Sequence, residues 1–218
     1  MEEIEKKIIE IMVPAVISEL ILEEKITENS GDEEVRQAIT SYLHSGKFDT
    51  MNVAITMGNE FEKAIENAIN LGQDNVAIAL AGICFEQITN QFYQKILLNK
   101  YDFSKREYES CMKGISVKDK LTWLYKLTTS KCMELSIVSD IHKICSLRNN
   151  IVHYKPKIES MGEWGEDEDN DDKNYDVSKI LPLIERVKEI FSEEADNLFP
   201  EEKMSKEIFK KVFGENNK

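Results

Sequence analysis

The residues best suited to chemistry in this chain lie between positions 142 and 157. This segment, HKICSLRNNIVHYKPK, contains four Lys or Arg side chains and two His side chains but no acidic residue. In a chain with a net charge of −13, it is a local cationic island. At its centre, RNNIVH places Arg148 five positions before His153. An imidazole titrates near neutral pH and an arginine is a fixed cation, so the pair fits acid–base chemistry on a phosphate group.

Helix geometry decides which of these side chains can face each other. At about 100° per residue, Arg148 and His153 lie about 140° apart around one straight helix, so they do not share a face. Either the long Arg side chain wraps around the helix, or a second subunit completes the site. Asn149 and His153 are four positions apart and do share a face, so the Asn149 amide can orient the imidazole.

The elements that position this motif are predicted to be helices. The chain has 218 residues, 41% of them hydrophobic, with only 9 Gly and 4 Pro, and its apolar residues recur at intervals of three and four. The strongest helical patterns cover residues 3–25, 76–98, 104–113, 117–129, 134–154, 177–197 and 203–213. The sequence therefore predicts an all-α fold, with Arg148 in the C-terminal part of the 134–154 helix and Trp123 in the core.

Charge, cysteine spacing and hydropathy exclude several classes of protein. A net charge of −13 argues against a broad cationic surface for nucleic acid, but leaves a local site open. The four cysteines are too far apart for a zinc knuckle or a redox pair, and we interpret them as reduced core thiols. The longest apolar run, residues 76–85, is about half of what spans a bilayer, and residues 1–10 lack the pattern of a signal peptide. We expect a soluble, cytoplasmic protein that does not engage a membrane.

One strongly acidic segment follows the cationic island. Residues 162–176 contain eight acids and one Lys and have no periodic apolar face, which predicts a mobile loop. This loop could mimic RNA and occupy the cationic site as an autoinhibitor, or it could be a plain solvated loop. Trp164 within it has no assigned role.

The motif and its surroundings resemble the HEPN superfamily, a group of all-α domains whose signature is R-x-x-x-x-H with a polar residue after the Arg. RNNIVH matches this signature. AIALAGICFEQITNQFY resembles the earlier core helix of the family, with Glu86 near its middle, and SVKDKLTWLYKL resembles the connecting helix. The resemblance covers about residues 50–195. It implies a HEPN-like helical bundle over residues 49–218, preceded by an N-terminal helical extension, residues 1–48, and interrupted by the acidic loop.

The resemblance also implies an activity, metal-independent endoribonucleolytic cleavage. RNA carries its own nucleophile, the 2′-hydroxyl, so such an enzyme needs a proton donor or acceptor and a cation for the developing phosphorane charge. His153 would be the first and Arg148 the second, while Asn149 would orient His153 or a phosphate oxygen. The products would be a 2′,3′-cyclic phosphate and a 5′-hydroxyl. No metal or other cofactor is expected.

Further residues are expected to support this site. Glu86 would pair with Arg148 and fix its guanidinium, Asn150 and Tyr154 would contact substrate, and three lysines would hold RNA phosphates: Lys143, Lys155 and Lys157.

The resemblance further implies a homodimer that brings two motifs into one cleft, a role in toxin or phage-defence systems, and an antitoxin or inhibitor protein as a second partner. Some relatives are modified by a nucleotidyltransferase antitoxin at a Tyr two residues beyond the motif His. Here Lys155 occupies that position and the Tyr is the next residue after His153. The sequence departs from that form of regulation.

Two other functions remain open on the sequence. The domain could be a catalytically silent HEPN-like dimeric module that binds nucleotide, RNA or a protein partner, or a structural dimeric adaptor without nucleic acid. In those cases Arg148 would neutralise a buried acid and His153 would cap the end of its helix.

Overall fold

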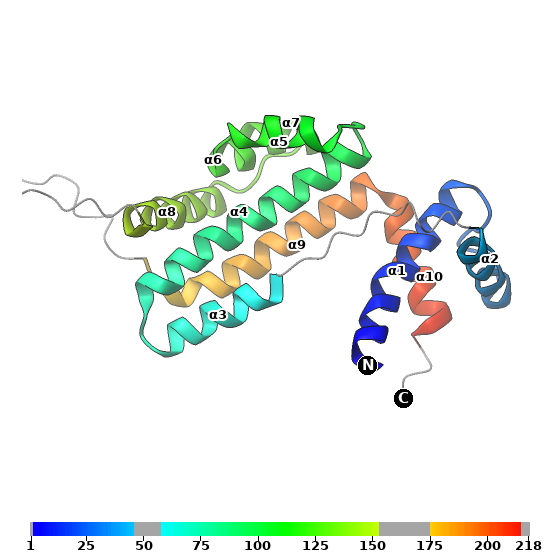
Figure 1. Cartoon of the computed structure of the whole chain (residues 1–218). Helices are drawn as coiled ribbons and strands as arrows, with labels where there is room; N and C mark the ends of the chain where they lie inside the picture. The colour runs from blue at the N-terminus through cyan, green and yellow to red at the C-terminus, as the bar shows by residue number, and fades with distance from the viewer. Residues whose placement is uncertain (1, 46–57, 153–174, 215–218) are drawn as a thin grey trace, which may run out of the picture. The chain divides into compact units, whose positions relative to one another are not determined.

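The computed structural model describes residues 2–45, 58–152 and 175–214 (Figure 1). These residues form helices joined by short turns, with no strand among them, which confirms the predicted all-α fold. The helices, in chain order, are α1 (Glu2–Leu22), α2 (Asp32–His44), α3 (Gly58–Asn70), α4 (Asp74–Asn99), α5 (Lys105–Lys113), α6 (Val117–Asp119), the π-helix η2 (Lys120–Leu124), α7 (Tyr125–Thr129), α8 (Leu135–Val152), the 3-10 helix η3 (Val177–Lys179), α9 (Ile180–Leu198) and α10 (Pro200–Phe213).

The chain divides into two compact units. One unit contains residues 1–56 together with 193–218, and the other contains residues 57–192. The division therefore falls within α9. The sequence-based division at position 48 did not group residues 193–218 with the N-terminal helices, whereas α10 packs against α1 and α2.

The first unit is built from α1, α2 and α10. α1 continues through Pro14, whose carbonyl oxygen accepts a hydrogen bond from the hydroxyl of Ser205 on α10. Apolar side chains from the three helices and from the α1–α2 turn form one buried cluster: Val16, Ile17, Leu20, Ile26, Val35, Ile39, Tyr42, Ile208 and Val212. Burial of these side chains stabilises the unit, since each large aliphatic residue removed from water contributes about 1.5–3 kcal/mol.

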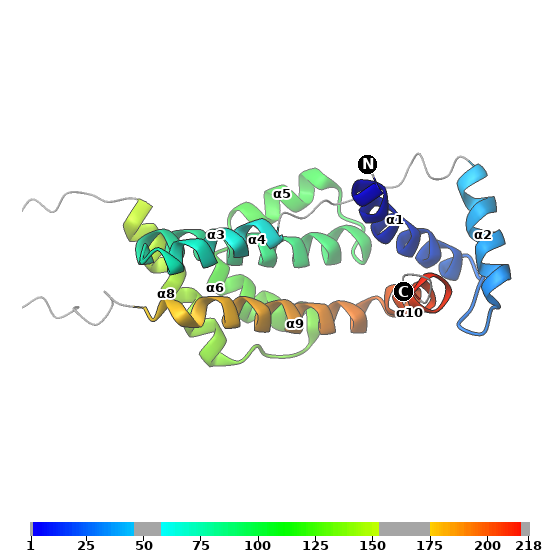
Figure 2. The ribbon, with the colours of Figure 1, turned by 90° about the horizontal axis from the view of Figure 1, so that it is seen from below.

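The second unit is organised around α4, which packs most extensively against α8 and α3 (Figures 1 and 2). α9 also lies against α4, because the Phe92 ring stacks on the Phe191 ring with centroids 4.2 Å apart. Lys188 on α9 forms an ion pair with Glu62 on α3. Helix α4 is thus covered by partners on several sides, as its nearly continuous apolar sequence predicts.

The segment predicted as one helix over 117–129 contains a π turn. The backbone is α-helical at Val117–Asp119, π-helical at Lys120–Leu124 and α-helical again at Tyr125–Thr129. The prediction that Trp123 lies in the core is wrong: its side chain is 49% exposed. Trp123 lies off the buried stripe of this segment, whose positions recur at intervals of three and four residues: Lys120, Leu121, Leu124, Tyr125 and Thr128.

Candidate functional site

The candidate site lies where α8 crosses one stripe of α4. Gly82, Glu86 and Asn90 follow at intervals of four residues and therefore occupy the same face of α4. Arg148 of α8 lies directly on this stripe. A Cβ at Gly82 would come within 2.9 Å of Arg148 Cδ and 3.0 Å of Arg148 Cβ, so any side chain at this position would force Arg148 or α8 to move.

The guanidinium group of Arg148 is held from two directions. Its Nη1 donates to Glu86 Oε2 at 2.7 Å, and its Nε and Nη2 both donate to Asn149 Oδ1, at 3.2 and 2.9 Å. The Arg148 side chain is 19% exposed and that of Glu86 is 44% exposed. The ion pair expected between Glu86 and Arg148 is therefore present, and it is a charge-assisted contact at the edge of the core.

The side-chain carbonyl oxygen of Asn149 accepts from the neighbouring Arg148, a contact that the sequence did not predict. The predicted role of Asn149 was to orient His153, which lies outside the described residues, or a phosphate oxygen. Adjacent residues on a helix point in directions about 100° apart. The contact forms because the long Arg148 side chain extends across to the Asn149 amide.

A buried lysine, Lys120, lies beside the same stripe of α4. Its side chain is 3% exposed, and its Nζ donates to Asn90 Oδ1 at 2.8 Å. Burial lowers the pKa of Lys120, and the Glu86 carboxylate acts in the opposite direction. The first residue of the π turn is therefore a second cation close to Glu86.

Two tyrosines fix the backbone around Lys120 and Asn90. Tyr93 Oη donates to the carbonyl oxygen of Lys120, and Tyr108 Oη donates to that of Asn90 at 3.0 Å. Sequence reasoning missed Lys120 altogether. The available signal was one Lys at the start of an apolar run, at a position that faces inward together with Leu121 and Leu124.

The thiol next to this site is inert. Cys145 is buried one turn before Arg148 on α8, and burial raises its pKa to about 11, although the Arg148 cation opposes the shift. Cys84 on α4 is also buried. Cys111 and Cys132 are exposed, so the prediction that all four thiols are core residues is wrong for these two.

The remaining predicted site residues fall into two groups. Asn150 is exposed on α8, and Lys143 is half-buried on the same helix. α8 ends at Val152, and four predicted residues lie outside the described part of the chain: His153, Tyr154, Lys155 and Lys157. Residues 162–174 of the acidic segment, with Trp164, lie outside it too.

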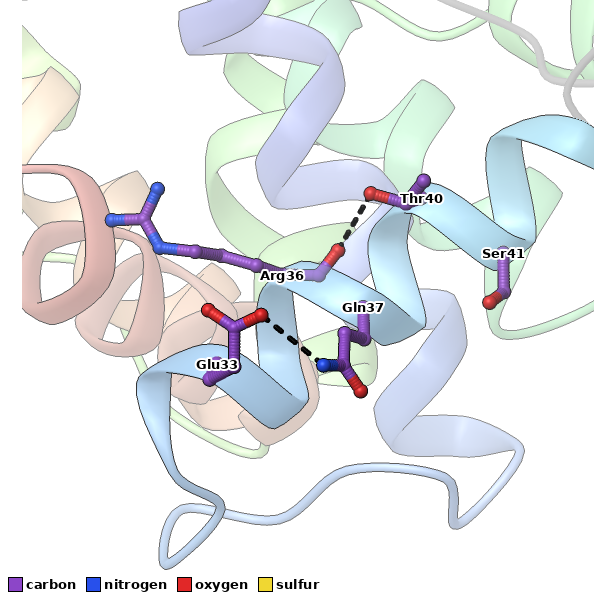
Figure 3. Close-up of a pocket in the computed structure, with 5 residues that line it drawn as sticks. All are labelled: Glu33, Arg36, Gln37, Thr40 and Ser41. Carbon is purple, nitrogen blue, oxygen red and sulfur yellow. Dashed lines mark hydrogen bonds between the residues drawn. The ribbon is translucent and has the colours of Figure 1, made fainter.

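A surface hollow of about 390 Å³ occupies one face of α2 in the first unit (Figure 3). Its lining is polar and comes from successive turns of one helix: Glu33, Arg36, Gln37, Thr40 and Ser41. Arg36 leaves the hollow to donate to the Val212 carbonyl oxygen at 2.6 Å and lies over the Phe213 ring. Gln37 donates to Glu33 at 3.1 Å. The Arg36 contacts join α2 to α10, whereas the bond between Gln37 and Glu33 lies within α2.

Within 2–45, 58–152 and 175–214, no three His, Cys, Asp or Glu side chains gather as ligands for a metal ion would. In the same ranges, no helix combines the length and the apolar content needed to cross a bilayer.

Comparison of the chain with known protein families, with curated proteins and with solved structures gave no match. The resemblance to the HEPN superfamily therefore stays a prediction that rests on the motif and the helices around it.

Proposed function

We propose that this protein is a HEPN-like, metal-independent endoribonuclease that cleaves RNA by attack of the 2′-hydroxyl on the adjacent phosphate. The observation that carries the proposal is the placement of Arg148. Its guanidinium is fixed by Glu86 and Asn149, and the Arg148 side chain as a whole remains 19% exposed. A fixed, accessible cation is what a developing phosphorane requires, since a group already in position needs no reorganisation when charge develops.

The guanidinium retains hydrogen-bonding capacity for a substrate. An arginine carries five N–H donors. Three of those of Arg148 donate to Glu86 and Asn149, so within the described residues two N–H groups remain without a protein acceptor. In the proposed mechanism these donors bind a non-bridging phosphate oxygen, while His153 transfers the proton. Asn150 and Lys143 on α8, with Tyr154, Lys155 and Lys157 beyond it, are proposed to bind flanking parts of the RNA.

The proposed assembly is a homodimer in which two motifs share one cleft. Large apolar side chains beside the site support it: Ile83 next to Gly82 is 42% exposed, and Val152 one turn after Arg148 is 61% exposed. In the proposed dimer the partner subunit covers these side chains and removes their apolar surface from water. The proposed setting is the cytoplasm, in a toxin or phage-defence system with an antitoxin or inhibitor protein as partner.

The first experiment tests cleavage directly. Wild-type protein, Arg148→Ala and His153→Ala are incubated with total cellular RNA in EDTA, and the ends of any fragments are analysed. We expect wild type alone to cleave and to leave 2′,3′-cyclic phosphate ends, with each variant reduced about hundredfold or more. Equal cleavage by all three proteins would show a contaminating nuclease and would remove the proposal.

A second function, a catalytically silent module, is favoured by one specific observation. The 2.7 Å ion pair with Glu86 offsets the charge of Arg148, as it would if the arginine were purely structural. This alternative predicts that wild-type protein and His153→Ala bind RNA or nucleotide equally well and that neither cleaves RNA.

A further inference from the structure

The Arg148 site contains an electrostatic conflict. Glu86 fixes the guanidinium at 2.7 Å, but the same carboxylate offsets the positive charge that a phosphate would need. Taken alone, the pair has no net charge. A further positive charge, supplied by another residue close to Glu86, is therefore needed to keep the site cationic.

We propose that Lys120 is this residue and that it acts as a positioning residue. Its buried ammonium, anchored by Asn90, compensates the charge of Glu86, so that the carboxylate can hold Arg148 while the site stays cationic. The inference deepens the proposed ribonuclease function and rests on it for its biological meaning. The cluster of Arg148, Glu86 and Lys120 then carries one positive charge in excess.

The geometry places Lys120 where it can act on Glu86. Asn90, which accepts from Lys120 Nζ at 2.8 Å, lies one turn beyond Glu86 on the same face of α4. Four residues advance about 6 Å along a helix axis, within the screening length of about 8 Å at physiological salt. The Lys120 side chain is 3% exposed and that of Glu86 is 44% exposed, so water screens the lysine side of this interaction less than the carboxylate side.

The local backbone explains how a lysine comes to be buried there. The π turn begins at Lys120, and Lys120 lies on the buried stripe of this segment together with Leu121 and Leu124. Tyr93 holds the Lys120 carbonyl oxygen and Tyr108 holds that of Asn90. Single π turns are frequent at functional sites. Burial of an ammonium is costly, and a methionine of similar length would fill the space at lower cost. The lysine is therefore explained better by its charge than by its packing.

The experiment combines Lys120→Met with Glu86→Gln in a double-mutant cycle. Two readouts are followed for the full chain: RNA cleavage in EDTA, and the affinity of Arg148 for inorganic phosphate, measured by titration of its Nε–Hε signal in NMR. If Lys120 acts through Glu86, Lys120→Met lowers the cleavage rate and the phosphate affinity by about tenfold in the wild-type background. In the Glu86→Gln background the same substitution lowers them by less than about twofold. A purely structural lysine would cause the same loss in both backgrounds and would overturn the inference.

Two further variants control for folding and overall charge. Lys120→Gln removes the charge but keeps an N–H donor for Asn90, and it replaces Lys120→Met if that variant unfolds. Lys126→Met removes the same charge from an exposed position on α7 and should leave both readouts unchanged.

The two proposals fail in different ways. Wild-type protein that binds phosphate in a Lys120-dependent manner but cleaves no RNA would overturn the ribonuclease and leave the charge compensation standing. Cleavage that depends on Arg148 but not on Lys120 would overturn the compensation alone. A protein with neither cleavage nor phosphate binding at Arg148 would overturn both.

Discussion

Replacement of Gly82 by Ala tests the packing that positions Arg148. The added Cβ would lie 2.9 Å from Arg148 Cδ, 3.0 Å from its Cβ and 3.3 Å from its Cγ. Cδ can rotate away, but Cβ is tied to the α8 backbone and can move only if the helix moves. The substitution therefore forces Arg148 off its bond to Glu86, pushes α8 from α4, or does both.

The magnitude follows from two opposing contributions. Gly→Ala inside a helix normally raises the free energy of unfolding by about 1 kcal/mol. Overpacking at a helix contact lowers it by about 1–3 kcal/mol, and a partly exposed charge-assisted hydrogen bond adds up to about 1 kcal/mol to the loss. We expect the free energy of unfolding of Gly82→Ala to fall by about 1–2 kcal/mol, and cleavage to fall with it.

The assay is urea unfolding followed by far-UV circular dichroism, carried out in two backgrounds. In Arg148→Ala, Cγ and Cδ are gone and only the 3.0 Å contact with Cβ remains. The loss caused by Gly82→Ala should then shrink to less than half or become a gain. Gly114→Ala is the matched control: this C-cap glycine of α5 has φ −94° and nothing within 4 Å of its added Cβ, so its effect should stay within about 0.5 kcal/mol.

Two results would refute this reasoning. If Gly82→Ala stabilises the wild-type protein as its helix propensity alone predicts, the close approach of Arg148 is not sterically limiting. If Gly82→Ala destabilises the wild type and Arg148→Ala backgrounds equally, the conflict lies with the α8 backbone and not with the Arg148 side chain.

Two further predictions concern the same region. Arg148→Lys keeps the charge but cannot donate in two directions from a planar group, so we expect an about hundredfold loss of RNA cleavage in EDTA; wild-type cleavage by this variant would show that charge alone suffices. The four thiols should separate into two classes when Ellman's reagent is added near pH 8. Cys111 and Cys132 are exposed and should react promptly, whereas Cys84 and Cys145, whose pKa values burial raises to about 11, should react only after unfolding; one common rate would contradict the burial assigned to the latter pair.

Helical periodicity predicted most of the helices because the apolar stripes are long and regular. The pattern over 134–154 corresponds to α8, Leu135–Val152, and the pattern over 76–98 corresponds to α4, Asp74–Asn99. The Glu86–Arg148 pair was reached through resemblance to a family and is present in the structure. Both successes depend on residues that follow the ordinary helical repeat.

The missed features run against residue type or cross between helices. Lys120 lies on the buried stripe with Leu121 and Leu124 although lysine is usually a surface residue, and Trp123 lies off that stripe although tryptophan is usually buried. Gly82 looks like any small residue in an apolar helix until the Arg148 side chain is seen against it. The association of residues 193–218 with the N-terminal helices joins segments far apart in the sequence, and helical periodicity does not predict which distant helices pack together.

All polar contacts of the Arg148 site on α4 come from one stripe, which makes this helix the element that sets the charge of the site. Gly82 receives the Arg148 side chain, Glu86 receives its guanidinium, and Asn90 receives Lys120. Arg148 and Lys120 belong to different helices, and the spacing of Glu86 and Asn90 on α4 places the partner of Lys120 one turn from the carboxylate that holds Arg148. A substitution that unwinds α4 between Glu86 and Asn90 would therefore separate the cations without removing any charge. Loss of phosphate affinity in such a variant would follow from the altered spacing, since every charged group of the cluster is retained.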